Sequence, residues 1–272
     1  MFRKLRFPIY TFFPIETVDE ASVHTDAVHA NKDGGWWDVH THRLDGDLQH
    51  AVWSCGWKDT VELSPVSGRK PEDSFPVDSC LMEEILGISK AHPIYISVGI
   101  HPWYLTEANF SEQWRWLTES VRSERVVAIG EAGLDKAVEV PFELQLSAFR
   151  RVIGVADEYG FPLIIHAVKA SNEILELKKK LRPRNPWIIH GFRGKKELAQ
   201  AYLRNGIYLS YGARYQEEAL RSTPLDYLFL ETDESAADIR ELYMRAAKIL
   251  EVPEINLREK VRQNINKLFF RH

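Results

Sequence analysis

The sequence is poor in cysteine, since its 272 residues contain only Cys55 and Cys80. Two cysteines cannot form the disulfide framework of a small secreted domain, which favours a reducing compartment. Long apolar runs are missing too, because none approaches the roughly 18 residues of a membrane-spanning helix. Residues 1–15 combine basic residues with a short apolar run, but Pro8 and Pro14 interrupt it and no clear cleavage site follows. We therefore expect a cytoplasmic protein without a membrane-spanning segment, and the sequence is silent on its oligomeric state.

A strong excess of charge is also missing, because the formal net charge is only −4. This excludes a broad basic face, so any contact with nucleic acid must come from a few Lys and Arg residues around one site. Hydrophobic residues make up 44% and charged residues 27%, which is an ordinary balance for a globular protein. The length fits two ordinary domains or one α/β barrel of about 250 residues.

Residues 1–35 show no convincing periodicity, and we expect them to be an N-terminal extension to a domain at 36–272. From Trp36 onward a short apolar strand, a polar loop and an amphipathic helix alternate. Strands are predicted at 36–40, 51–55, 94–100, 126–129, 163–165, 187–189, 207–211 and 228–230. Helices are predicted at 78–91, 110–123, 141–159, 171–181, 195–205, 216–221, 236–250 and 256–269, with a long loop at 60–77.

Two of these helices carry terminal signals: Pro141 is expected in a first turn and Ser171 is expected to cap the next helix. The alternation of strands and helices predicts parallel pairing and, at this length, a single α/β (β/α)₈ TIM-like barrel. A doubly wound open sheet is the alternative, because it uses the same alternation. No dinucleotide-binding glycine fingerprint follows the first strand, however.

The segment Asp38-Val39-His40-Thr41-His42 is the first candidate site. In a strand, residues two apart point to the same face, so Asp38, His40 and His42 should look one way. The two imidazoles would stand about 6.6 Å apart along the strand, close enough to turn onto one metal ion. A metal site here depends on whether the other strands supply the remaining ligands.

Polar residues also follow several later apolar runs. These residues are His101, Glu131, His166, His190 and Asp233. Any one of them could be a satisfied core residue, but the C-terminal ends of parallel barrel strands gather at one mouth, where active sites of this fold lie. Imidazoles that hold cations and carboxylates that bridge them are the groups that hydrolysis at two metals needs. The sequence therefore predicts a metal site at the C-terminal mouth.

These motifs carry a family resemblance. The segments concerned are Asp38–His42, Gly99–Pro102, Gly130–Asp135, Gln145–His166, Ile189–Phe192 and Glu231–Asp233. In this order and spacing the chain resembles the TatD family of metal-dependent deoxyribonucleases and hydrolases, within the wider amidohydrolase-like barrels. The resemblance covers about residue 36 to the C-terminus and leaves the extension outside.

The resemblance implies two divalent metal ions. One would be held by His40, His42, Glu131 and Asp233, and the other by Glu131, His166 and His190, with Glu131 bridging. The ion pair would activate a water, and Asp233 would take its proton as general base, so Glu131 and Asp233 would be the catalytic residues. A histidine-rich set of ligands suits Zn, Mn, Fe, Co or Ni better than Mg, which prefers oxygen.

The substrate side departs from the family. Val168 stands where the family often has an Arg two residues after the histidine, and Lys169 follows as a point charge or a solvated loop residue. Arg193 is the better candidate for a cationic rim. His101 could contact a phosphate, and Trp103 could stack on a base or anchor its loop.

Two further acids are expected near the ligands. Asp135 is expected to orient a loop or a ligand, and Glu231 to support a ligand or to fill the inner layer with a partner.

Together these implications predict a metal-dependent hydrolase acting as a phosphodiesterase or exonuclease-like deoxyribonuclease, with DNA or a small phosphodiester as substrate. The alternatives are hydrolysis of a carboxylic ester, lactone or amide on the same metal pair, and a catalytically silent metal-binding protein. The position of Lys169 and Arg193 distinguishes phosphodiester hydrolysis from the first alternative. If these cations face the metals, a phosphate substrate is favoured.

Overall fold

Eight strands form one parallel sheet in the order β1 to β8. The computed structural model describes residues 35–43, 50–59 and 95–270. The strands are β1 (Asp38–Thr41), β2 (Ala51–Gly56), β3 (Tyr95–Gly99), β4 (Val126–Asp135), β5 (Leu163–Val168), β6 (Trp187–Ile189), β7 (Ile207–Tyr211) and β8 (Leu228–Leu230). Nearly every residue in them is buried, as expected for a sheet that is covered on both faces.

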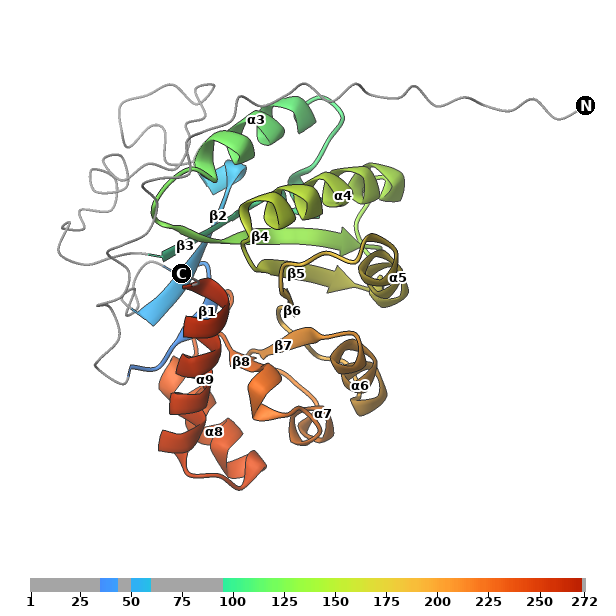
Figure 1. The fold of residues 1–272 in the computed structure, drawn as a ribbon. Helices are drawn as coiled ribbons and strands as arrows, with labels where there is room; N and C mark the ends of the chain where they lie inside the picture. Colours follow the sequence, from blue (N-terminus) through green and yellow to red (C-terminus); the bar gives the residue numbers. More distant parts are fainter. Residues whose placement is uncertain (1–34, 44–49, 60–94, 271–272) are drawn as a thin grey trace, which may run out of the picture.

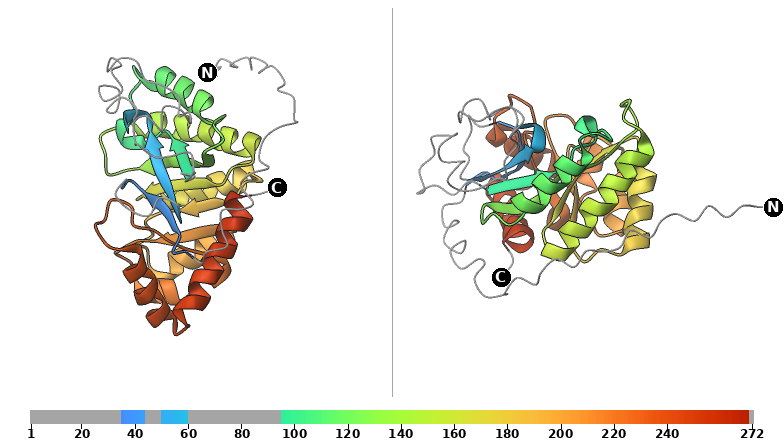
Figure 2. Two further views of the ribbon diagram at one scale, coloured as in Figure 1. Left: turned by 90° about the vertical axis from the view of Figure 1, so that its left-hand side faces the viewer. Right: turned by 90° about the horizontal axis from the view of Figure 1, so that it is seen from above.

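The sheet comes round on itself between β8 and β1. The backbone N–H of Asp233 donates to the carbonyl of His40 at 3.0 Å, and the N–H of His42 donates to the carbonyl of Asp233 at 3.2 Å. A parallel bridge joins Thr41 and Asp233. Figures 1 and 2 show the strands following one another from β1 to β8. The predicted barrel is therefore confirmed over the open-sheet alternative, as a nearly closed barrel.

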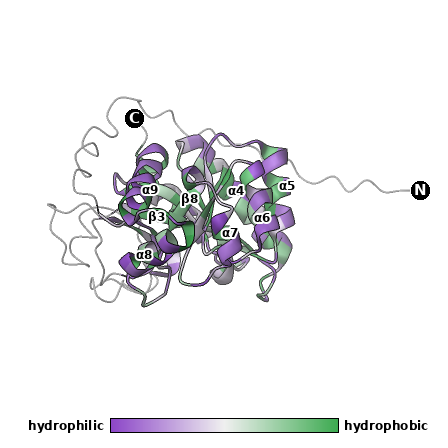
Figure 3. Ribbon diagram, turned by 90° about the horizontal axis from the view of Figure 1, so that it is seen from below, coloured by the Kyte–Doolittle hydropathy of each residue, from purple (hydrophilic) through white to green (hydrophobic). Residues whose placement is uncertain are grey.

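Helices alternate with the strands and lie outside the sheet (Figure 1). They are α3 (Phe110–Ser120), α4 (Phe142–Tyr159), α5 (Ser171–Leu181), α6 (Lys196–Arg204), α7 (Glu217–Arg221), α8 (Ile239–Leu250) and α9 (Glu254–Phe269), with short 3₁₀ helices η3 (Pro102–Tyr104) and η4 (Leu225–Tyr227). In α4, Ala148, Phe149, Val152, Ile153 and Ala156 recur at helical spacing and are buried against the sheet. Figure 3 shows hydrophobic strands inside helices of mixed hydropathy.

β4 and β5 are longer than the apolar runs predict. The runs end at Ile129 and Ile165, whereas parallel pairing continues as far as the Asp135–Val168 pair. A side chain at Gly133 would meet the carbonyl oxygen of His166 at 2.0 Å, so glycine lets the two backbones approach here. Glu131 and His166 therefore lie on strands, not on loops.

Several helix starts also differ from prediction. Pro141 lies just before α4 as its N-cap. The expected cap by Ser171 is wrong, because Ala170 is the N-cap of α5 and makes no side-chain cap hydrogen bond. α8 begins at Ile239, not at 236, because the carboxylate of Asp238 accepts from the N–H of Arg240 at 2.8 Å and caps the helix there.

Some predictions fall outside the described residues: most of the 1–35 extension, the 60–77 loop, the 78–91 helix and Cys80. The extension and the boundary at residue 36 stay predictions. Cys55 is buried in β2 with a free thiol. In the part of the chain that is described, no helix has the length and hydropathy to cross a membrane.

Candidate metal centre

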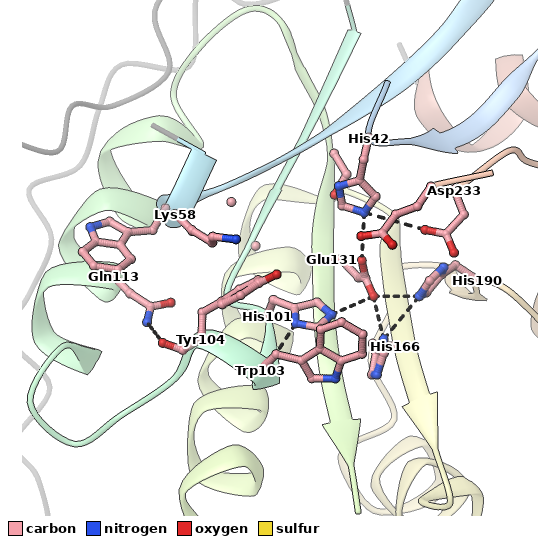
Figure 4. Close-up of a pocket in the computed structure, with 15 residues that line it drawn as sticks. His42, Lys58, His101, Trp103, Tyr104, Gln113, Glu131, His166, His190 and Asp233 are labelled. Carbon is pink, nitrogen blue, oxygen red and sulfur yellow. Dashed lines mark hydrogen bonds and ion pairs between the residues drawn. The ribbon is translucent and has the colours of Figure 1, made fainter. Parts of the chain in front are cut away.

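The Glu131 carboxylate lies at the centre of a cluster of imidazoles (Figure 4). Its Oε2 atom is 3.3 Å from His40 Nε2 and 3.3 Å from His42 Nε2. The Oδ1 atom of Asp233 lies 3.8 Å from each of the same two nitrogens. The imidazoles of His40 and His42 therefore face one carboxylate oxygen from β4 and one from the segment after β8.

The other oxygen of Glu131 faces a second group of imidazoles. Oε1 lies 2.9 Å from His101 Nε2, 2.6 Å from His166 Nδ1 and 2.7 Å from His190 Nε2. The facing nitrogens of His166 and His190 are 3.5 Å apart. The two oxygens of one carboxylate thus serve two separate sets of nitrogen atoms, which is the arrangement of a bridging ligand.

The cluster is strongly coupled electrostatically. Burial alone would raise the pKa of Glu131, but the imidazoles of His190 and His101 hold it well below its usual range. Burial opposes the charge on His190, yet the Glu131 and Glu231 carboxylates raise the pKa of His190 well above its ordinary value. Burial lowers the pKa of His101, whereas Glu131 and Asp233 raise that of His42 against its burial. Glu131 is therefore ionised, ready to face cations.

The donor set fits divalent metal ions. His40 is fully buried, and neither of its ring nitrogens makes a hydrogen bond in the described part of the chain. A buried imidazole with both nitrogens unsatisfied is costly unless a ligand is bound. Among the described residues, three sets of side chains could each hold an ion: His40, His190 and Asp233; His40, His42 and Glu131; and His101, Glu131 and His166. Imidazole nitrogens and carboxylate oxygens are the common ligands of first-row metals.

Asp135 holds the outer side of His166. Its Oδ2 atom lies 2.9 Å from His166 Nε2 and accepts from Trp103 Nε1 at 2.7 Å. Burial alone would raise the pKa of Asp135, but these bonds lower it. The Gln145 side chain bonds both the N–H and the carbonyl of Asp135, at 2.7 and 2.9 Å. The expectation that Asp135 orients a ligand is therefore consistent with its position.

Glu231 lies on the outer side of His190, at ion-pair distance. It is fully buried, and its Oε1 atom accepts from the N–H of Gly191 at 2.5 Å and lies 3.4 Å from His190 Nδ1. Burial would raise its pKa, but His190 lowers it. Of the two roles expected for Glu231, the contact favours support of a ligand.

Asp38, expected to point to the same face as His40 and His42, contacts Thr232 and not the Glu131 carboxylate. Its carboxylate accepts from the N–H and the hydroxyl of Thr232, at 3.0 and 2.6 Å. Burial raises the pKa of Asp38 to about 7. These hydrogen bonds between Asp38 and Thr232 connect β1 to the segment that follows β8.

The cluster lines one wall of a pocket (Figure 4). Of the residues predicted to bind substrate, His101 and Trp103 line this pocket, whereas Arg193 lines a second, adjoining pocket. Lys169 is exposed and lines neither, so its role stays a prediction.

Sequence reasoning missed other residues that line these pockets. They are Trp57, Lys58, Tyr104 and Gln113 in the first, and Arg214 in the second. Lys58 Nζ lies 4.6 Å from the centre of the Tyr104 ring. Lys58 and Arg214 each come two or three residues after the end of a strand, β2 or β7, so the strand-end rule applied to His101 and Glu131 could have found them.

Comparisons with known proteins agree with this geometry. Residues 75–270 match the model of the TatD-related DNase family. The chain is 34% identical over 209 residues to the uncharacterized metal-dependent hydrolase YabD of Bacillus subtilis, covering 72% of this chain and 78% of the relative. It is 30% identical over 173 residues to the 3′-5′ RNA nuclease TATDN2 of Homo sapiens, covering 59% of this chain but only 22% of that protein.

A solved structure shares the fold. YjjV, a TatD homologue from Escherichia coli, superposes with a TM-score of 0.66 at 17% identity, over 87% of this chain and 99% of that one. The barrel predicted from alternation is thus found in a protein of low sequence identity. Because the family model spans most of the described barrel and includes every strand from β3 onward, the chain belongs to the TatD-related DNase family.

Proposed function

We propose that this chain is a divalent-metal-dependent hydrolase that cleaves phosphodiester bonds in nucleic acid strands. The observation that carries the proposal is the division of the Glu131 carboxylate, with Oε2 facing His40 and His42 and Oε1 facing His166 and His190. The family match and the metal-dependent hydrolase among its relatives support the same activity.

The two sets of imidazoles, one on each oxygen of Glu131, would suit two metal ions. His40, His42, Glu131 and Asp233 would hold one, and Glu131, His166 and His190 would hold the other, with Glu131 shared. The predominance of imidazole favours Zn, Mn, Fe, Co or Ni over Mg. When bound, such ions lower the pKa of a water and stabilise negative charge that develops on a phosphate.

Asp233 is the proposed general base. It is partly exposed, lines both pockets and belongs to the segment that closes the barrel. Its backbone lies in the left-handed region at φ 57°, a conformation that Asp tolerates better than most residues. A carboxylate in this position can take the proton of the attacking water at its free oxygen. His101, which lines the first pocket and whose Nε2 atom lies 2.9 Å from Glu131 Oε1, is the proposed contact for a phosphate oxygen of the substrate.

The first pocket suits a nucleotide. Trp103 and Tyr104 are 47% and 39% exposed and offer aromatic faces for a base, and Lys58 supplies a cation above the Tyr104 ring. Lys169 could add a further point charge from the end of β5. The family is described as DNases, and the human relative is named an RNA nuclease, so DNA strands and RNA strands are both candidate substrates. A cytoplasmic location stays a prediction.

The test measures both the metal content of the purified chain and its turnover of nucleic acid. The purified chain should contain about two divalent ions, and single-stranded DNA or RNA should be degraded with Mn²⁺ or Zn²⁺ and not with a chelator. His166→Ala should abolish turnover while circular dichroism and the melting temperature stay close to those of the parent. Asp233→Asn should reduce kcat by about 10²–10⁴-fold.

Controls separate the alternatives. Substitution of the exposed Glu218 by Gln, on α7, should change neither metal content nor turnover. Hydrolysis of a carboxylic ester without any phosphodiesterase activity would move the chain to the ester, lactone or amide class. Full activity of His166→Ala would remove the two-metal proposal.

A further inference from the structure

A second pocket adjoins the metal centre on the side of β6, β7 and β8. It is lined by residues that follow these three strands, and Asp233 and Glu234 line this pocket as well as the first one. The two pockets therefore adjoin at the proposed general base. We call the second one the arginine pocket, because Arg193 and Arg214 are its two cationic residues.

The guanidinium groups of Arg193 and Arg214 have no interaction partner among the described residues. Both side chains are exposed, and neither makes a hydrogen bond, an ion pair or a ring contact with any residue that the structure describes. Two other arginines of this half of the barrel do have partners: Arg221 pairs with Glu251 at 3.2 Å, and Arg245 donates to the carbonyl of Ala213 at 3.0 Å. The arginine pocket thus carries free donors directly beside the reaction site.

The acids in the same pocket do not neutralise these arginines. Glu231 is fully buried, and its Oε1 atom is bound to the N–H of Gly191 and faces His190. Asp233 faces the two histidines of β1 at 3.8 Å. Glu234 is an exposed acid of the same pocket, but no carboxylate oxygen of the described residues, its own included, lies within 4.0 Å of either guanidinium. An incoming anion therefore meets two guanidinium groups that are not held in ion pairs.

We propose that the arginine pocket binds the phosphate next to the scissile one in a nucleic acid strand. The proposal rests on the phosphodiesterase function above and specifies its substrate: a strand with at least one phosphate beyond the bond that is cut. A guanidinium presents planar donors that match two phosphate oxygens at once. The aromatic faces of Trp103 and Tyr104 would hold a nucleoside on the other side of the metal centre.

The first test measures binding without turnover. A fluorescently labelled oligothymidylate is titrated with the chain in the presence of a chelator, at several salt concentrations. For single strands, the slope of log K against log salt changes by about 0.7 for each phosphate contact. The double variant Arg193→Ala/Arg214→Ala should bind at least about tenfold more weakly and lose about 0.7 from the slope. Arg204→Ala, on an exposed arginine at the C-terminal end of α6, is the matched control and should bind like the parent.

The second test measures turnover of three thymidine dinucleotides: one with only the internal phosphodiester, one with a further 5′-phosphate and one with a further 3′-phosphate. The parent should show a KM about tenfold lower for one of the two phosphorylated dinucleotides than for the dinucleotide without the extra phosphate. Which of the two has the lower KM tells whether the arginine pocket lies on the 5′ or the 3′ side of the bond that is cut. In the double variant this ratio of KM values should fall to about one, whereas Arg204→Ala should keep it.

The outcomes separate the two proposals. If the parent cleaves no dinucleotide and no longer strand, the proposed function fails. If the parent cleaves them but neither added phosphate lowers KM, or the double variant keeps both the ratio and the salt slope, the arginine pocket alone is overturned. Melting temperatures of the variants confirm that the fold is kept.

Discussion

The Nε2 atom of His166 lies 2.9 Å from the Oδ2 atom of Asp135. When a metal is bound, a carboxylate on this nitrogen would keep the proton on Nε2, so that Nδ1, which faces Glu131, would offer its lone pair to the ion. The same Oδ2 also accepts from the indole of Trp103, so the acceptor is fixed from a second side. The tautomer that can bind a metal is thus selected by a residue that does not itself face the cluster.

Asp135→Asn should therefore weaken metal binding with little effect on folding. The amide cannot accept from both His166 and Trp103 while it also accepts from the N–H of Ala137 with its other end. We expect the metal affinity to fall by about 10–100-fold, measured by competition with a chromophoric chelator. Asp238→Asn, an exposed helix cap that Asn serves equally well, is the control. An unchanged affinity in Asp135→Asn would show that His166 needs no orienting carboxylate.

Lys178 should destabilise the fold at neutral pH. Its Nζ atom lies 4.8 Å from the centre of the Trp187 ring, and partial burial lowers its pKa to about 8, below the ordinary value of 10.5. Because the folded-state pKa is lower, the charged form is disfavoured in the fold below pH 8, and this penalty disappears as the pH rises towards 10.5.

Lys178→Met should therefore raise the free energy of unfolding by about 1 kcal/mol at pH 7, after allowance for solvent screening and the favourable ring contact. The gain should shrink towards pH 10.5. Urea unfolding at several pH values measures it, with the exposed Lys179→Met as the control. A loss of stability at pH 7 would mean that the ring contact outweighs the burial.

The order and type of most elements could be predicted from the sequence, because strands buried on both faces read as apolar runs and the helices show a clear period. β6, β7 and β8 have the predicted bounds, at Trp187–Ile189, Ile207–Tyr211 and Leu228–Leu230. Parallel strands place their C-terminal ends at one mouth, so residues far apart in sequence could be expected to meet. His40 and Asp233 are 193 positions apart and come within 3.8 Å.

What could not be predicted depends on contacts between segments. β4 looks as if it ends at Ile129, since Gly130 and Glu131 are poor strand residues, yet pairing with β5 carries it to Asp135. The partner of Asp38 is Thr232, which belongs to a segment 194 positions away and could not be named from the sequence. Arg214 is one exposed arginine among many until β6, β7 and β8 bring it to the same pocket as Arg193.

Glu131→Gln should remove the link between the two sets of ligands. A neutral amide offers one oxygen and one N–H₂ donor, so the set that meets the NH₂ loses its ligand. We expect the metal content to fall from about two ions per chain to one or none, and turnover to be lost. Mass spectrometry with inductively coupled plasma gives the content, and Glu218→Gln again serves as the control. Two tightly bound ions in Glu131→Gln would contradict a shared carboxylate.

Metal binding should release protons at neutral pH. Against the effect of burial, the carboxylates of Glu131 and Glu231 raise the pKa of His190 well above its ordinary value, so the metal-free chain holds this imidazole as a cation at pH 7. A protonated ring cannot donate its lone pair to a metal, so the proton must leave as the ion enters. His42, whose pKa is also raised, adds to the effect.

The sign follows directly: below the raised pKa the proton competes with the metal, so the apparent affinity should fall as the pH is lowered from 8 to 6, by up to about tenfold per pH unit for each proton displaced. Calorimetry at pH 7 in two buffers of different ionisation enthalpy should show release of about one proton or more per chain. His190→Ala should release about one proton fewer. An affinity that does not vary with pH would mean that His190 is neutral before the metal binds and that Glu131 alone attracts the ion.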